Sequence, residues 1–372
     1  MAGGRVIEPD LELIRDIKKA GGADLKKCYQ CATCSAVCDL SPEHHPFPRK
    51  EMLMAQWGQT EKLAQDPDVW LCHQCNDCSV HCPRGAKPGD VLAAIRSRIY
   101  QYYSFPRFMG RALATPKALP ALFAFPMIVI LAMMLYFTGG NFTFMQHEIV
   151  FSEFLPHGWI EGLFITGNVI IFAFAFVGLW RFWQGLQSGA EPGSGPGFVS
   201  GLIGTVIAVI VHRDFAKCTT NKPRYLAHML VLFGFVGAIA TAGLALIAMV
   251  VFKLDPPIPL THPIKWLGNI SAAAGIIGLG ILIIRRMTNR DQVGANGYSD
   301  WLFLIMLFLV FLTGWSTQFL RLAETNYLAY GIYYIHLVFV FFLLWYMPYS
   351  KFAHMLYRTM ALVHARAIGR IA

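Results

Sequence analysis

The sequence has few charged side chains for its length. Only 14% of its 372 residues are charged, whereas hydrophobic residues make up 55%. Soluble domains carry roughly 25% charged residues, so this composition excludes a chain that is soluble throughout. The net charge of +9 does not indicate nucleic-acid binding, because the cationic residues lie beside apolar segments and the chain contains no nucleic-acid-binding motif.

The sequence also lacks several features of secreted and nucleotide-binding proteins. Its N-terminal stretch, MAGGRVIEPDLELIRDIKKAGG, has no apolar core, so we expect no cleaved export signal. There is no low-complexity tract and no glycine-rich nucleotide-binding loop. Of the nine cysteines, only Cys218 lies outside two groups of four. Such grouping argues for metal in a reducing compartment rather than for disulfides, and it leaves Cys218 with a structural or a redox role.

What the sequence has instead is a repeated cysteine pattern. The segments CYQCATCSAVCD and WLCHQCNDCSVHCPRG each contain the spacing C-x2-C-x2-C-x3-C. This spacing is typical of ligands to [4Fe–4S] clusters, whereas zinc sites usually use cysteine pairs. In two-cluster ferredoxins the fourth cysteine of each run binds the other cluster. The predicted ligands are therefore Cys28, Cys31, Cys34 and Cys82 for cluster 1, and Cys72, Cys75, Cys78 and Cys38 for cluster 2.

Residues near these cysteines have secondary roles in this interpretation. Cys38 is followed by Asp39 where such ferredoxins have proline, but that proline is not a ligand. The nearby histidines are expected to tune or shield the clusters rather than bind them. They are His44, His45, His73 and His81.

The first 105 residues predict an α-helical ferredoxin domain with two [4Fe–4S] clusters. Helical spacing of apolar residues appears in Leu11–Ala20, Arg49–Gln65 and Pro88–Tyr103, and no segment shows strand alternation. A long helical segment separates the two cysteine runs, which suits an α-helical ferredoxin better than the small β-containing kind. Residues 106–372 then form a second, membrane domain.

After Pro106 the chain contains six apolar runs that are long enough to cross a bilayer, for which about 20 residues are needed. The expected spans are 119–138, 159–181, 226–252, 264–284, 300–320 and 328–349. A shorter run, 198–211, follows a Gly/Pro-rich link, and we expect it to be an interfacial helix on the membrane surface. The predicted fold class is all-α, a helical ferredoxin fused to a six-helix transmembrane bundle.

The distribution of basic residues predicts the orientation of this bundle. With six spans, the ferredoxin side carries most of the basic residues of the membrane domain, from Arg107 to Arg370. The opposite loops carry only Lys253, Lys265 and Arg321. The positive-inside rule then makes the ferredoxin side cytoplasmic. We expect a multi-pass protein of the cytoplasmic (inner) membrane, with the ferredoxin domain and both termini in the cytoplasm.

Four histidines lie in or beside the expected spans, where ionisable groups are costly and usually functional. In this topology His228 and His354 lie on the inner side, and His262 and His336 lie on the outer side. His336 and His354 are about five helical turns apart, so on a continuous helix both rings point to one face. We therefore predict two haems b, the inner one bound by His228 and His354 and the outer one by His262 and His336.

Other interpretations of the histidines stay open at this stage. Each histidine alone is also explained as an anchor at the end of a span. His157 lies at an outer span end and is an alternative to His262. His212 follows the short apolar run, and we expect it at the surface.

With these motifs in place, the chain resembles a known family. The soluble part resembles the iron–sulfur subunit of heterodisulfide reductases. The membrane part resembles their cytochrome b subunit and, more distantly, the gamma subunit of respiratory nitrate reductases. The resemblance is carried by the two cysteine runs, the histidines of the sixth span, and the segments HRDFAKC, AHMLVLFGF and HPIKWLGN. A fusion in this order is similar to the QmoC family, the membrane subunit of the quinone-interacting membrane-bound oxidoreductase complex of sulfate-reducing prokaryotes.

The resemblance implies a quinone-linked oxidoreductase subunit that transfers electrons and performs no other substrate chemistry. Electrons would pass between menaquinol and two cytoplasmic flavin and iron–sulfur subunits, similar to QmoA and QmoB, and through them to APS reductase in sulfate respiration. It also implies a di-haem cytochrome b bundle. Outer-side residues considered for the quinone site are Lys265, Arg321, Glu324 and Glu161.

Two alternatives remain for the function. One is a related menaquinol-linked module that serves a heterodisulfide or sulfite-reduction system. The other is a membrane-anchored polyferredoxin without haem. A transporter with a ferredoxin regulator is disfavoured, because no span shows the paired Gly/Pro breaks of inverted repeats.

Overall fold

The computed structural model describes residues 8–146, 148–189, 195–212, 222–254, 256–289, 293–294 and 297–371. These residues form helices and turns and contain no strand, which confirms the all-α prediction. Cys218 and most of the HRDFAKC segment lie outside the described residues.

Small helices build the N-terminal part. They are α1 (Leu11–Lys19), η1 (Ala23–Lys27), α2 (Thr33–Ala36), α3 (Arg49–Gln56), α4 (Thr60–Gln65), α5 (Asp68–Leu71), α6 (Asp77–Val80) and α7 (Pro88–Tyr103). The single helix expected over Arg49–Gln65 is wrong, because the chain turns at Gly58 between α3 and α4. Gly58 has a φ of +63°, and a Cβ there would lie 2.6 Å from the Asp10 backbone nitrogen. Only glycine combines this left-handed conformation with so close an approach.

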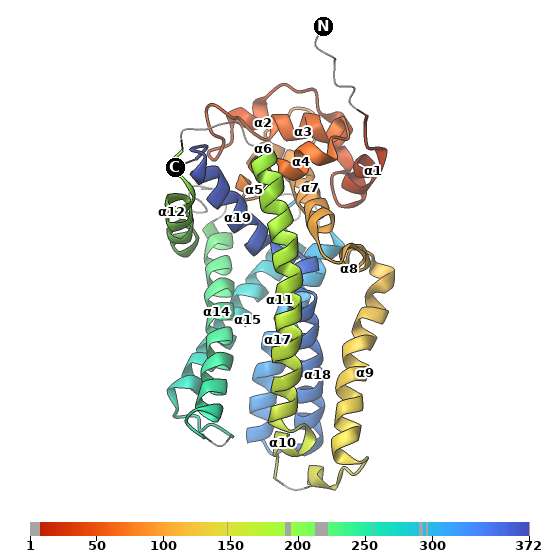
Figure 1. Cartoon of the computed structure of the whole chain (residues 1–372), viewed down its shortest axis with the longest axis vertical. Helices are drawn as coiled ribbons and strands as arrows, with labels where there is room; N and C mark the ends of the chain where they lie inside the picture. The colour runs from red at the N-terminus through yellow and green to blue at the C-terminus, as the bar shows by residue number, and fades with distance from the viewer. Residues whose placement is uncertain are drawn as a thin grey trace.

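Among the described residues, six helices are long and apolar enough to cross a membrane. They are α9 (Leu119–Thr138), α11 (His157–Ser188), α14 (Lys222–Val250), α15 (Pro263–Thr288), α17 (Tyr298–Leu322) and α18 (Asn326–Trp345). They coincide with the six expected runs, and the chain is therefore a multi-pass membrane protein. They run along the long axis of the molecule, and the N-terminal part and the C-terminus lie at the same end (Figure 1).

Shorter elements connect the long helices or follow them. They are α8 (Arg107–Leu113), η2 (Pro116–Ala118), η3 (Thr143–Gln146), α10 (Phe151–Phe154), α12 (Phe198–Val211), η5 (Met347–Tyr349), η6 (Lys351–Ala353) and α19 (His354–Ala367). Helix α12 is the short apolar run of the sequence, and it packs against α19 at the end that carries the N-terminal part (Figure 1).

Helix α12 has two different faces. Its small residues meet α19, where a Cβ on Gly201 would lie 2.7 Å from the Val363 carbonyl oxygen. Arg366 donates a hydrogen bond of 3.2 Å to the Thr205 hydroxyl on the same face. Large apolar side chains such as Ile210 are exposed on the other face. A helix with one face on protein and one apolar face uncovered suits a position at the membrane surface, which stays our prediction for α12.

The sixth long helix ends earlier than the sequence predicts. Helix α18 stops at Trp345, and two short 3-10 turns follow before α19 begins at His354. Pro348 accounts for the break, because proline lacks an N–H and disfavours the helical conformation in the residue before it. His336 and His354 therefore do not lie on one continuous helix. The prediction that helical periodicity turns both rings to one face is wrong.

The N-terminal part and the membrane helices share one hydrophobic core. Trp70 stacks on Tyr357 of α19 with ring centroids 5.7 Å apart, and it meets Phe182 of α11 edge-on at 5.8 Å. Tyr100 and Tyr103 of α7 belong to the same core. This core fixes the cysteine-bearing part directly to one end of the bundle.

A buried ion cluster also joins the C-terminal residues to the N-terminal part. Lys50 Nζ lies 2.9 Å from the carboxylates of both Asp66 and Asp68, and Arg370 Nη2 lies 2.8 Å from Asp68. Glu51 is fully buried beside them, with its carboxylate 3.4 Å from Lys50. Burial, followed by the neighbouring Asp66 carboxylate, raises the pKa of Glu51 well above its usual range.

We expect Glu51→Gln to stabilise the protein at neutral pH. Because the pKa of Glu51 is higher in the folded state, folding takes up a proton above the unfolded pKa. Stability is then complete below the unfolded value and falls as pH rises through the folded value. Thermal unfolding across the acid-to-neutral range should show a flatter profile for Glu51→Gln, with Tm at neutral pH raised by about 2–4 °C. Glu61→Gln, at an exposed site on α4, is the matched control. A lower Tm at neutral pH would show that Glu51 is ionised when folded.

Candidate metal centres

The two cysteine runs fold into loops with the same backbone conformation. In each loop, the residues on both sides of the second cysteine have positive φ. They are Gln30 and Ala32 in the first loop (62° and 66°) and Gln74 and Asn76 in the second (54° and 70°). Each loop then enters a four-residue helix, α2 or α6, that carries the third cysteine. Left-handed residues bend the chain sharply, so each loop can turn three cysteines towards one point.

A small cavity brings together cysteines from both runs. Its walls include Cys38 from the first run and Cys72, Cys75 and Cys78 from the second. Burial and the nearby Cys72 and Cys75 thiols raise the pKa of the Cys38 thiol to about 12. These four residues are the ligands that the sequence predicts for cluster 2.

The remaining cysteines gather around Cys28. Burial raises the pKa of the Cys28 thiol, and the nearby Cys82 and Cys31 thiols raise it further. Burial and the Cys28 thiol together raise the pKa of Cys34 to about 11. Cys82 of the second run thus lies among the first three cysteines of the first run, as expected of the ligands to cluster 1.

Hydrogen-bond donors surround the sulfur atoms. The Gln74 amide donates to Cys72 Sγ and the Ala86 amide donates to Cys82 Sγ, both at 3.3 Å. The Gln30 side chain donates to Cys28 Sγ at 3.4 Å. Such N–H···S bonds help to set the reduction potential of an iron–sulfur cluster. Two groups of four thiols drawn from both runs, with these donors, fit two [4Fe–4S] clusters.

Two arginines of the membrane part hold the second cysteine loop. Arg358 of α19 donates to the carbonyl oxygens of Cys72 and Leu71, at 3.3 and 3.4 Å. Arg224 of α14 donates to the carbonyl oxygen of Gln74 at 2.5 Å. These hydrogen bonds connect the second loop to the membrane part.

Three histidines gather beside these arginines. The rings of His212 and His228 are 5.1 Å apart between centroids, and His228 also interacts electrostatically with His354. His354 Nδ1 lies 2.6 Å from the Lys351 carbonyl oxygen. This contact orients the ring and leaves Nε2 for a metal ligand bond. The structure thus brings the predicted inner pair together.

The expectation that His212 lies at the surface is wrong. Helix α12 ends at His212, whose φ of 52° is left-handed, and the half-buried ring contacts His228. One sequence feature pointed to a buried position for His212, namely that it directly follows an apolar run. It did not show that α12 packs against α19.

The two outer histidines have separate surroundings. His336 Nδ1 lies 3.0 Å from the Thr313 hydroxyl, and a Cβ on Gly314 would lie 2.8 Å from the His336 ring. His262 caps α15 instead, where its Nδ1 accepts a hydrogen bond of 3.2 Å from the Ile264 amide. The described contacts do not join the two rings, so the outer pair stays a prediction.

Of the outer residues considered for a quinone site, Lys265 belongs to a polar link between α15 and α17. Lys265 donates to Gln318 at 3.3 Å, and Gln318 donates to Asn269 at 2.9 Å. Arg321 interacts electrostatically with Lys265, while Glu324 is exposed. In these contacts Lys265 joins α15 to α17.

Comparison with known proteins identifies both parts of the chain. Residues 24–86 match the family described as 4Fe-4S dicluster domain, and residues 112–372 match the family described as Citrate utilization protein B. The first match shows that the N-terminal part is an iron–sulfur electron-transfer domain. No solved structure gives a significant match.

Curated relatives are subunits of heterodisulfide reductases. One subunit of the H(2):CoB-CoM heterodisulfide,ferredoxin reductase of Methanothermobacter marburgensis is 35% identical over 89 residues, which is 24% of this chain and 48% of that protein. A protein of Archaeoglobus profundus, named for its likeness to a heterodisulfide reductase subunit, is 33% identical over 89 residues, or 24% of this chain and 47% of that protein. The chain spans about half the length of the curated relatives it matches.

These matches establish an oxidoreductase-type electron-transfer subunit that contains iron–sulfur clusters and membrane helices. The larger match covers more than two thirds of the chain and all of its long apolar helices beyond Ala112. The chain therefore belongs to the family described as Citrate utilization protein B and carries a 4Fe-4S dicluster domain in its N-terminal part.

Proposed function

We propose that this subunit passes electrons between menaquinol in the membrane and cytoplasmic partner subunits, through two haems b and two [4Fe–4S] clusters. The carrying observation is that two arginines connect the second cysteine loop to the inner histidine group. Arg224 and Arg358 donate to carbonyl oxygens of that loop and also interact with His228. The residues that would hold cluster 2 and those that would hold the inner haem are thus connected through the same two arginines.

The cluster ligands in this proposal come from both cysteine runs. The cavity that contains Cys38 beside Cys72, Cys75 and Cys78 supports the crossed assignment, as does the proximity of Cys82 to Cys28. Clusters held in this way supply one-electron transfer. The chain's own residues orient the thiolates and donate N–H bonds to sulfur.

The inner histidines fit a haem better than the outer pair does. His354 is oriented by the Lys351 carbonyl oxygen and interacts electrostatically with His228 of α14. Apolar side chains of α14, such as Phe233 and Val236, are exposed, and such side chains could pack on a flat prosthetic group. At the outer site, Thr313 orients His336, while either His262 or His157 would complete the pair.

The surface around cluster 1 suits the exit of electrons to a partner. Cys31 is exposed, and the neighbouring Tyr29 and Val80 are exposed apolar side chains. We propose that two flavin and iron–sulfur subunits similar to QmoA and QmoB dock here, on the cytoplasmic side, and lead to APS reductase. The positive-inside distribution of Lys and Arg supports this orientation.

A second candidate is a menaquinol-linked module for a heterodisulfide or sulfite-reduction system. The names of the curated relatives favour it, because they are those of heterodisulfide reductase subunits. Both candidates require the same cofactors in this chain. Capture of native partners on the full chain, followed by their identification, distinguishes the two candidates through the proteins that are retained.

The cofactor content of the purified full chain tests the proposal. We expect about eight non-haem iron atoms and about eight acid-labile sulfides per chain, since each [4Fe–4S] cluster holds four of each. We also expect about two haems b per chain by pyridine haemochrome assay. A full content of non-haem iron without b-type haem would overturn the haem proposal and leave a membrane-anchored polyferredoxin.

A further inference from the structure

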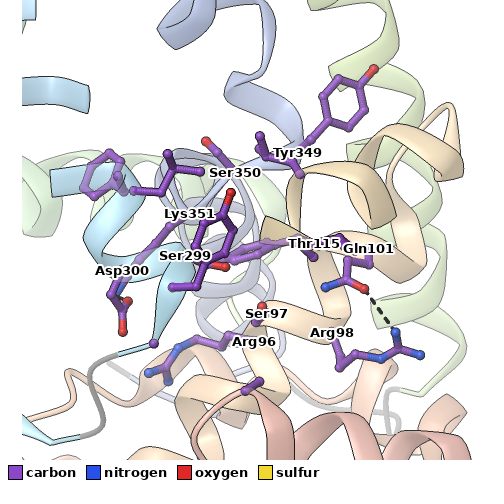
Figure 2. Close-up of a pocket in the computed structure, with 18 of the residues that line it drawn as sticks. Arg96, Ser97, Arg98, Gln101, Thr115, Ser299, Asp300, Tyr349, Ser350 and Lys351 are labelled. Atoms are coloured by element: carbon purple, nitrogen blue, oxygen red, sulfur yellow. Dashed lines mark hydrogen bonds and ion pairs between the residues drawn. The ribbon is translucent and has the colours of Figure 1, made fainter. Parts of the chain in front are cut away.

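A cavity of about 440 Å³ lies where the N-terminal part meets the membrane helices. Its walls come from α1 and α7 on one side, and from α8, the start of α17 and the turns η5 and η6 on the other (Figure 2). The volume is within the range of sites that bind small organic molecules, roughly 300–1,000 Å³.

The walls of this cavity divide into a polar half and an apolar half. The polar half is built largely from α1 and α7, and the apolar half from the ends of α17 and α18. Polar lining residues include Asp16, Arg96, Arg98 and Gln101, and apolar ones include Leu302, Phe303, Met306, Phe342 and Leu343. Asp16 and Arg98 already form an ion pair at 2.9 Å. The cavity therefore suits a molecule with a polar ring and an apolar tail.

A half-buried ion pair lies in the cavity wall formed by α17 and η6. The Lys351 ammonium binds the Asp300 carboxylate, and Arg286 lies 3.4 Å from the other carboxylate oxygen. Figure 2 shows Asp300 and Lys351 across the cavity from the hydrogen-bonded pair of Arg98 and Gln101. This wall offers both a hydrogen-bond donor and an acceptor.

A tyrosine hydroxyl in the lining lacks a partner. Tyr298 lines the cavity, and its hydroxyl oxygen is buried without a hydrogen bond to any part of the chain that the structure describes. Leaving such a buried group without a hydrogen bond is unfavourable. An oxygen atom of a bound ligand would satisfy it.

The cavity is also lined by residues that adjoin both groups of proposed redox ligands. Gln74 of the second cysteine loop is one of its lining residues. Lys351 is another, and its carbonyl oxygen orients the inner histidine His354. A ligand in this cavity would therefore lie beside cluster 2 and the inner haem.

We propose that this cavity binds the head group of a quinone, an inference that rests on the proposed electron-transfer function. Tyr298 and Lys351 would donate to the quinone oxygens, Asp300 would accept from a quinol hydroxyl, and Phe303 and Met306 would pack on the ring or tail. The quinone site then lies on the same side of the membrane as the clusters. It does not involve the outer residues Lys265, Arg321 and Glu324.

Binding of a short-chain naphthoquinone analogue to the full chain tests this inference without turnover. The oxidised protein is placed in phosphatidylcholine nanodiscs free of quinone, and Kd is measured from quenching of intrinsic fluorescence. We expect Tyr298→Phe and Met306→Trp each to raise Kd by about tenfold, through loss of one hydrogen bond and through filling of the apolar half. Lys265→Met, in the outer link, should leave Kd unchanged.

The possible outcomes separate the site from the function. If the analogue binds the parent chain and both cavity variants with the same Kd, the proposed site is wrong. The proposed electron-transfer function is unaffected by that result. Absence of binding to the parent chain contradicts both. The alternative ligand is an anionic phospholipid, held by the basic lining residues Arg96, Arg98 and Lys351. Cardiolipin is therefore titrated in parallel. The inference is overturned if cardiolipin binding, but not quinone binding, depends on Tyr298 and Met306.

Discussion

Replacing Cys82 with alanine should remove the cluster built on the other cysteine run. Cys82 lies close to Cys28, so Cys82→Ala leaves cluster 1 with three thiols. We expect the non-haem iron content to fall from about eight to about four atoms per chain. Electron paramagnetic resonance spectra of the reduced protein should then match those of Cys28→Ala.

The reciprocal variant provides the matched control. Cys38 lines the cavity with Cys72, Cys75 and Cys78, so Cys38→Ala should give the spectrum of Cys75→Ala instead. If Cys82→Ala resembles Cys75→Ala, each run binds its own cluster and the crossed assignment is refuted. The comparison needs no knowledge of either reduction potential.

Replacing either inner histidine should remove one haem. We expect His228→Ala and His354→Ala each to lower the content from about two haems b to about one per chain, while the iron held in clusters is unchanged. The reason is that both rings lie in one group, and the Lys351 carbonyl oxygen leaves His354 Nε2 available. Pyridine haemochrome and non-haem iron assays on the same samples measure both quantities.

A third variant, at His212, tests which histidine pairs with His228. Its ring is 5.1 Å from the His228 ring, so His212 is an alternative to His354 as the residue that would hold the inner haem with His228. If His354 is the ligand, His212→Ala keeps both haems. Loss of a haem in His212→Ala together with full content in His354→Ala would assign the inner haem to His212 and His228. His44→Ala, at an exposed site of the N-terminal part, controls for general effects of removing a histidine.

The features that sequence reasoning found are those that depend on local spacing. A run of cysteines at C-x2-C-x2-C-x3-C and an apolar stretch of about 20 residues are each recognisable within one segment. The dicluster domain and the six candidate spans were therefore predictable. Helix α7 likewise starts and ends where its pattern predicts.

The features that it missed depend on contacts between distant segments. Arg358 reaches the carbonyl oxygen of Cys72 only because α19 folds back onto the N-terminal part. His212 meets His228 only because α12 packs on α19. The break at Pro348 was visible in the sequence, but its consequence for His336 and His354 needed the turns that follow α18. The cavity beside Asp300 and Lys351 is likewise assembled from segments far apart in the chain.

The most direct test of the central claim is reoxidation of the reduced chain by a menaquinone analogue. The full chain in nanodiscs is reduced with dithionite, freed of reductant and mixed with the analogue while the haem and cluster absorbances are followed. The account predicts that clusters and haems both reoxidise at rates on the order of 10 s⁻¹, as for typical enzyme turnover. It also predicts that His354→Ala slows reoxidation of the clusters. Clusters that stay reduced in the presence of the analogue would contradict the account.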